Sequence, residues 1–190
     1  MKKINIILLI VILALVVGLI LLLKNSKIEE KPTKTKKEEI NYIDYTSYDK
    51  NFSIRTSKDW KLVDNRKLLN KDANLELYNE KLNAYFLLVV NNKIDYKKNF
   101  NNYKAEVFKQ KIEQYNIKIK EFKKVNVNNY NWEYIEFNYT NENAINTYIR
   151  SYAIETKNYY GQILVWTIAS NQNEATNEFD NIISKFKEIE

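Results

Sequence analysis

Residues 132–169 read WEYIEFNYTNENAINTYIRSYAIETKNYYGQILVWTIA and contain three long runs rich in aromatic and β-branched residues, which favour strands. The runs are Trp132–Tyr139, Ile145–Ile154 and Tyr160–Ala169. Because only short polar connections separate them, we expect three antiparallel neighbours joined as a meander. In the last run Ile163 and Val165 point to one face while Leu164, Trp166 and Ile168 point to the other. This pattern predicts a central strand that is covered on both faces.

Two segments have the periodicity of amphipathic helices. The first follows Asp95, which we expect to be its N-cap, and its apolar stripe is Phe100, Tyr103, Val107, Phe108, Ile112 and Tyr115. The second lies near the C-terminus, and its stripe is Ala175, Phe179, Ile182, Ile183, Phe186 and Ile189. We expect the second helix to close one face of the sheet.

Shorter strand candidates complete a domain that spans residues 40–190. They are Tyr42–Tyr45, Phe52–Arg55, Leu75–Tyr78, Ala84–Val90 and Ile117–Phe122. A turn at Asp49-Lys50-Asn51 separates the first two. Together with the helices, these elements predict an α+β fold in which an antiparallel β-sheet is sandwiched by helices.

The order of these elements resembles the PsbP/Mog1/DcrB-like superfamily over about residues 42–188. The residues that carry the resemblance are Phe52-Ser53-Ile54, Trp60, Tyr85–Val90, the helix before Tyr115, Asn129–Tyr134, Tyr160-Gly161-Gln162-Ile163 and Phe179–Phe186. The resemblance implies a PsbP/Mog1-like α/β/α sandwich that acts as a binding or accessory domain, and it transfers no catalytic residue. Where the family commonly has Gly before the meander, this chain has Asn128-Asn129, which tolerates a left-handed backbone.

The N-terminus carries the pattern of a membrane anchor. A short basic tail at residues 1–3 precedes residues 4–23, an apolar run without a charge that is long enough, at about 30 Å as a helix, to cross a bilayer. We therefore expect one N-terminal transmembrane signal-anchor helix, with the lipid bilayer as the partner of residues 4–23. The alternative is a cleaved signal peptide, for which Val16-Val17-Gly18 is the small-x-small match.

Residues 24–39 contain six Lys, four Glu and one Pro, which predicts a charged flexible linker. It is either a solvated spacer or a segment whose lysines contact anionic headgroups. These lysines alone favour a cytoplasmic domain, but a basic tip before the first apolar run is the usual start of an export signal. We expect a single-pass protein of a bacterial cell membrane whose C-terminal domain is extracytoplasmic.

Composition excludes several function classes. The absence of His and Cys removes the usual nucleophile–base pairs, disulfides, Cys/His zinc sites and common haem ligation, so we expect no cofactor and no metal. The net charge of +6 comes mostly from residues 1–39, because residues 40–190 carry 22 basic and 20 acidic side chains. A nucleic-acid partner is therefore not expected.

Two groups of residues are candidates for a site. The first is a set of aromatic side chains that form either core layers or a partly exposed patch for binding a partner: Trp132, Tyr134, Tyr148, Tyr152 and Trp166, with Tyr160 beside them. The second is Glu133, Glu136 and Arg150 on adjacent strands, which either hold a polar ligand or form an ion pair on a solvated edge worth under about 1 kcal/mol.

These observations favour a protein that is not an enzyme. We expect a non-catalytic binding or accessory domain that acts on another protein or assembly of the cell envelope. One alternative is a structural tether or homo-oligomer at the membrane, which predicts a self-complementary patch. A second is an envelope hydrolase that uses carboxylates only, which requires two carboxyl groups roughly 5–9.5 Å apart in a cleft.

Overall fold

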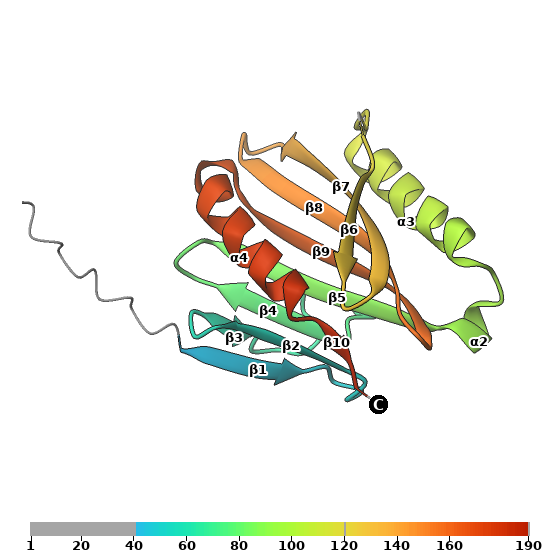
Figure 1. The fold of residues 1–190 in the computed structure, drawn as a ribbon. Helices are drawn as coiled ribbons and strands as arrows, with labels where there is room; N and C mark the ends of the chain where they lie inside the picture. The colour runs from blue at the N-terminus through green and yellow to red at the C-terminus, as the bar shows by residue number, and fades with distance from the viewer. Residues whose placement is uncertain (1–40, 120, 190) are drawn as a thin grey trace, which may run out of the picture. The chain divides into compact units, whose positions relative to one another are not determined.

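The fold is organised around β9 (Tyr159–Ile168), the strand predicted to be central. It lies fourth in a seven-stranded antiparallel sheet with the order β3-β4-β5-β9-β8-β7-β6 (Figure 1). The other strands are β3 (Trp60–Leu62), β4 (Leu75–Asn79), β5 (Ala84–Asn92), β6 (Lys123–Val127), β7 (Tyr130–Thr140) and β8 (Asn146–Glu155). The meander predicted from residues 132–169 is therefore β7, β8 and β9, and its three strands pair as neighbours.

This computed structural model describes residues 41–119 and 121–189. The predicted tail, transmembrane helix and linker at residues 1–3, 4–23 and 24–39 lie outside these residues. Within the described part of the chain, no helix is both long and apolar enough to cross a membrane.

A second, three-stranded antiparallel sheet contains the strands at the two ends of the domain. It consists of β1 (Tyr42–Thr46), β2 (Phe52–Ser57) and β10 (Lys187–Glu188), in the order β1-β2-β10. The turn between β1 and β2 has Lys50 at a positive φ of 63°, as expected for the predicted Asp49–Asn51 turn. The strand β10 is only two residues long, which is too short for a sequence pattern to predict.

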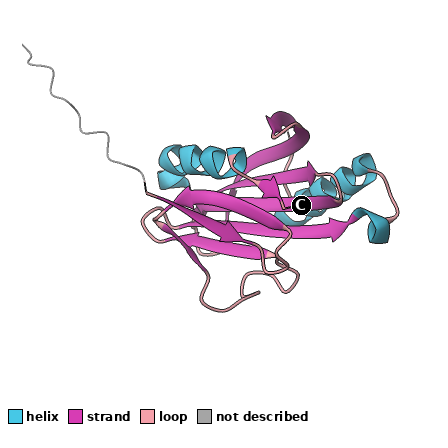
Figure 2. Cartoon of the chain, turned by 60° about the horizontal axis from the view of Figure 1, so that its bottom comes forward, coloured by secondary structure: helices cyan, strands magenta, loops and turns pink. Residues whose placement is uncertain are grey.

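The two faces of the large sheet are covered differently. The α4 face packs against helix α4 (Gln172–Ser184), which follows a short 3₁₀ turn η1 (Ala169–Asn171), and against β2. The opposite α3 face packs against α3 (Phe100–Tyr115), preceded by the short α2 (Lys93–Tyr96). Figure 2 shows that the helices lie outside the sheets. The predicted sandwich of a sheet between helices is confirmed, with part of the α4 face covered by strands.

The core follows the alternation of the strands. The main cluster lies on the α4 face and includes the fully buried side chains Phe52, Trp60, Phe86, Trp132, Ile163, Val165, Phe179 and Phe186. Two smaller clusters on the α3 face contain Tyr103, Val107, Phe108 and Ile135, and then Leu87, Ile149 and Leu164. Ile163 and Val165 of β9 point into the first cluster and Leu164 into the last, so this strand is covered on both faces as predicted.

Three predicted boundaries were wrong. The sequence of residues 117–122 alternates in polarity, but the described residues 117–119 and 121–122 are not in a strand. Asn128 and Asn129 adopt φ values of 48° and 68° and make a two-residue turn that pairs Lys123–Val127 with β7 instead. The N-cap of α3 is Asn99, whose side chain accepts the backbone N–H of Asn102, and Asp95 lies in α2. Helix α4 ends at Ser184, so Phe186 and Ile189 follow it in an extended segment that forms β10.

Candidate functional site

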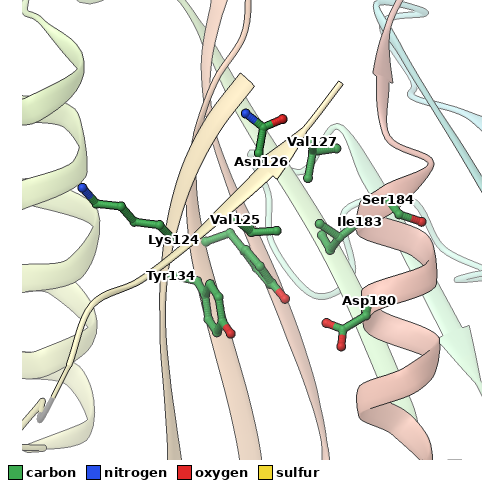
Figure 3. Close-up of a pocket in the computed structure, with 9 residues that line it drawn as sticks. Lys124, Val125, Asn126, Val127, Tyr134, Asp180, Ile183 and Ser184 are labelled. Carbon is green, nitrogen blue, oxygen red and sulfur yellow. The ribbon is translucent and has the colours of Figure 1, made fainter. Parts of the chain in front are cut away.

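A cleft of about 270 Å³ lies between β6 and α4 (Figure 3). Its lining residues come from four elements: Lys124, Val125, Asn126 and Val127 of β6, Tyr134 of β7, Tyr152 of β8, and Asp180, Ile183 and Ser184 of α4. Figure 3 shows the β6 strand on one side of the cleft and the α4 helix, with Asp180 and Ser184, on the other. The cleft thus combines apolar and polar groups, a composition typical of binding sites.

The wall that β6 contributes is the edge of a strand. Successive side chains of a strand point to opposite faces, so a cleft lined by four consecutive residues is bordered by their backbone. β6 pairs with β7 along one edge and is the last strand of the sheet, and no described strand pairs with its other edge. The N–H and C=O groups of that edge are available to a partner in extended conformation.

The floor of the cleft consists of aromatic rings held in place by Arg150. Tyr134 and Tyr152 lie directly opposite each other on β7 and β8, with ring centroids 4.9 Å apart. The guanidinium of Arg150 lies 5.3 Å from the centroid of the Tyr134 ring, within the range of a cation–π contact. Only 7% of Arg150 is exposed.

Arg150 is the centre of a hydrogen-bonding network that joins β7, β8 and α4. Arg150 Nε donates to Glu136 Oε2 at 2.9 Å and to the Tyr148 hydroxyl at 2.6 Å, and its Nη1 donates to Asp180 Oδ1 at 2.6 Å. Tyr148 in turn donates to Glu136 Oε2 at 2.6 Å, and Lys123 bonds the other oxygen of Glu136. One buried cation is therefore shared by two carboxylates from different elements, which ties α4 to the centre of the sheet.

The network shifts the pKa values of its members. Burial raises the pKa of Glu136, but hydrogen bonds from Lys123 and Tyr148 and the charge of Arg150 lower it by more, so its pKa lies below the ordinary 4.5. Burial and the hydrogen bond to Glu136 raise the pKa of Tyr148 to about 12. Glu136 is thus an anion and Tyr148 a neutral donor at neutral pH, and neither is set up to exchange a proton.

The structure divides the predicted aromatic set. Trp132, Tyr148 and Tyr152 are buried in the main cluster, Tyr134 is half-buried, and all four lie on the α4 face. Tyr134 and Tyr152 line the cleft. Trp166 is half-buried on the α3 face and lines a different cavity. Tyr160 packs on the α3 face against Tyr103.

The predicted polar group is also divided. Glu136 and Arg150 lie on adjacent strands as expected, and the register places them directly opposite each other. The pair is not on a solvated edge, because β8 is an interior strand and Arg150 is covered by α4. Glu133 lies on the other face of β7 and pairs with Lys104 of α3 at 2.7 Å. Asp180 was missed because it lies 30 residues from Arg150 in the chain, and no local pattern connects them.

Comparisons with known proteins are informative only at the level of structure. No protein-family model and no curated protein matches the sequence. The solution structure of the PsbP protein of Synechocystis has a TM-score of 0.57 at 7% identity, covering 79% of this chain and 94% of that one. Saccharomyces cerevisiae Mog1p, described as a Ran-binding protein, has a TM-score of 0.53 at 10% identity, covering 80% and 97%. The fold is that of PsbP and Mog1.

A further similar structure is of a Bacteroides thetaiotaomicron protein, with a TM-score of 0.54 at 12% identity. The match covers 77% of this chain but only 48% of that protein, so the chain spans about half of its length. The resemblance to the PsbP/Mog1/DcrB-like superfamily inferred from the sequence is thus confirmed for the fold. At these identities the comparisons assign no residue of the PsbP/Mog1-like domain a role.

Proposed function

We propose that this protein is a non-catalytic, membrane-anchored binding domain that faces outward from a bacterial cell and docks onto another envelope protein through the cleft between β6 and α4. In this proposal an extended segment of the partner pairs with the free edge of β6 and places a side chain over Tyr134 and Tyr152. The observation that carries the proposal is that four consecutive β6 residues line a cleft next to a strand edge with which no described strand pairs.

The chemistry of the cleft supports binding without catalysis. A glycosidase-type pair needs one carboxyl group whose pKa is raised so that it can act as an acid. Here Glu136 has a lowered pKa and shares Arg150 with Asp180, so both carboxylates are neutralised by a structural cation. The sequence also has no His or Cys to supply a base or nucleophile.

Two other observations support a protein partner at the membrane. Mog1p, which has the same fold, is described as binding the protein Ran, so this fold can present a protein-binding surface. The apolar run at residues 4–23 and the linker at 24–39 have the length and composition of an anchor and a spacer. A tethered domain of this kind needs only modest intrinsic affinity, because the membrane concentrates it near its partner.

Site-specific photo-crosslinking in intact cells tests the docking surface. Asn126 is exposed on β6, and the full-length chain with p-benzoylphenylalanine at this position is expected to form an adduct with a second, different protein. The same amino acid at the exposed Ile94 of α2, outside the cleft, is expected to form none. An adduct of twice the chain's mass would favour the homo-oligomer, and equal adducts from both positions would contradict the proposal.

A cleft-filling variant sharpens this test. Ser184→Trp places a large ring at the cleft and replaces no member of the Arg150 network, and it is expected to abolish the Asn126 adduct. Asn177→Trp is the matched control, because Asn177 is exposed on the same helix and does not line the cleft.

Protease treatment of intact and lysed cells tests the orientation: cleavage of a C-terminal tag in intact cells is expected, and protection until lysis would place the domain in the cytoplasm.

A further inference from the structure

A second and larger cavity lies on the α3 face of the sheet, away from the β6–α4 cleft. Its volume is about 460 Å³, within the range of small-molecule sites. The floor is apolar and consists of Leu87, Ile149 and Leu164, and aromatic side chains of Tyr115, Tyr139 and Trp166 line its sides. The C-terminal half of α3 contributes Lys111 and Gln114. Nothing in the proposed function uses this cavity.

The sheet beneath the cavity carries a row of aromatic side chains with one interruption. Tyr78, Tyr85 and Trp166 occupy matching positions on β4, β5 and β9, and their rings are 4.9 Å and 5.0 Å apart, with the last two stacked at 10°. On the next strand the matching residue is Ile149, and on the strand after that it is Phe137, which contacts Tyr115. The aliphatic Ile149 thus interrupts the aromatic row, and it lines the cavity together with Trp166 and Tyr115.

Lys111 places a cation beside this apolar space. Only 8% of the residue is exposed, yet no carboxylate among the described residues lies within ion-pair distance of its ammonium group. Its hydrogen bond is to the side-chain oxygen of Gln114, at 3.1 Å. A buried ammonium group that is paired only with an amide retains much of its desolvation cost, which a bound anion would reduce.

We propose that this cavity binds a small planar aromatic carboxylate. The aromatic body lies against Ile149 and Leu164, between Trp166 on one side and Tyr115 and Tyr139 on the other. The carboxylate pairs with the Lys111 ammonium group. Because the site lies on the α3 face and shares no lining residue with the β6–α4 cleft, it is independent of the protein partner proposed above.

Calorimetry with the full-length chain in phosphatidylcholine nanodiscs tests the site, with empty nanodiscs as the blank. The probe is 2-naphthoate, which is expected to bind with a Kd of about 1 mM or tighter. Two matched compounds separate the requirements: 2-naphthylmethanol keeps the ring but has no charge, and decahydro-2-naphthoate keeps the carboxylate but is not planar. Each is expected to bind at least about tenfold more weakly, a difference of about 1.4 kcal/mol.

The Lys111→Met variant identifies the cation. It is expected to weaken 2-naphthoate binding at least about tenfold and to leave the weak binding of 2-naphthylmethanol unchanged. Lys109→Met is the control, because Lys109 is exposed on the same helix and pairs with Glu113. Thermal unfolding shows that each variant is folded. No binding of 2-naphthoate by the natural chain, equal binding of the three compounds, or unchanged binding by Lys111→Met would each overturn the proposal.

Discussion

Among the residues that the structure describes, one buried cation lies on each face of the large sheet, and the two cations have opposite surroundings. Arg150 on the α4 face is 7% exposed and is shared by the carboxylates of Glu136 and Asp180. Lys111 on the α3 face is 8% exposed, and its partner among the described side chains is the amide oxygen of Gln114. Similar burial therefore has different consequences. The charge of Arg150 is compensated by carboxylates of the fold and joins β7, β8 and α4, whereas the charge of Lys111 is the one that we propose a ligand compensates.

The largest expected effect tests how tightly the α4 face is closed. Phe179→Ala removes a fully buried ring that packs against Trp60, and we expect the free energy of unfolding to fall by about 3–5 kcal/mol. Phe137→Ala on the more open α3 face removes a half-buried ring of the same size, and we expect a smaller loss. Chemical denaturation measures both. Equal losses would mean that the two faces are packed alike.

Removing the compensated cation is expected to have the next largest effect. Arg150→Met leaves Glu136 and Asp180 without their shared partner, and we expect a loss of about 3 kcal/mol, at the low end for a broken buried pair because Asp180 is largely solvated. Denaturation at neutral pH measures the change. A variant as stable as the natural chain would show that the network adds nothing to stability.

The acid limb of the stability curve reports on the same network. The pKa of Glu136 is lower in the folded state than in the unfolded state, so ionised Glu136 stabilises the fold. This stabilisation is fully present above about pH 4.5 and is lost as the pH falls through the pKa of Glu136 in the folded state. Stability of the natural chain should therefore decrease below pH 4.5, and Glu136→Gln should make this decrease shallower. The midpoint of urea unfolding measured from pH 7 to pH 3 checks the slope. An unchanged slope in the variant would contradict the ionised state of Glu136.

The smallest expected effect is a gain in stability, and it comes from a substitution on the α3 face. Lys111→Met replaces an uncompensated buried charge by an apolar chain of similar length, and we expect the free energy of unfolding to rise by about 1 kcal/mol. Lys109→Met on the exposed side of α3 should change little. A destabilised Lys111→Met variant would show that the charge already has adequate partners in the fold.

The elements that the sequence predicted well have strong local patterns. The β7–β9 meander follows from three runs of β-branched and aromatic residues, and the centre of the sheet follows from apolar positions on both faces of β9. Residues 117–122 have a similar alternation, but those of them that the structure describes are not in a strand, since the Asn128-Asn129 turn sets the pairing of β6. Patterns of side chains predict a strand only where a neighbour pairs with it.

The site residues also divide into those with a local sequence pattern and those that only the tertiary fold brings together. The sequence predicted that Glu136 and Arg150 lie on adjacent strands, but it did not determine the register that places them opposite each other. Asp180 reaches Arg150 only because α4 packs on the sheet. Lys111 carries a local signal that was available in the sequence. It follows Val107 by four residues and Phe108 by three, so it falls on the apolar stripe of its helix, where a lysine is unusual.

The most direct test of the difference between the two cations is an NMR titration of the full-length chain with ¹³C-methylated lysines, with Lys111 assigned by its absence from Lys111→Met. Burial lowers the pKa of the Lys111 ammonium below its ordinary value of 10.5, so its resonance should titrate at a lower pH than those of the exposed lysines. Saturating 2-naphthoate should move this pKa upward, since a bound carboxylate favours the charged form. A Lys111 resonance that titrates with the exposed lysines and does not respond to 2-naphthoate would contradict the account.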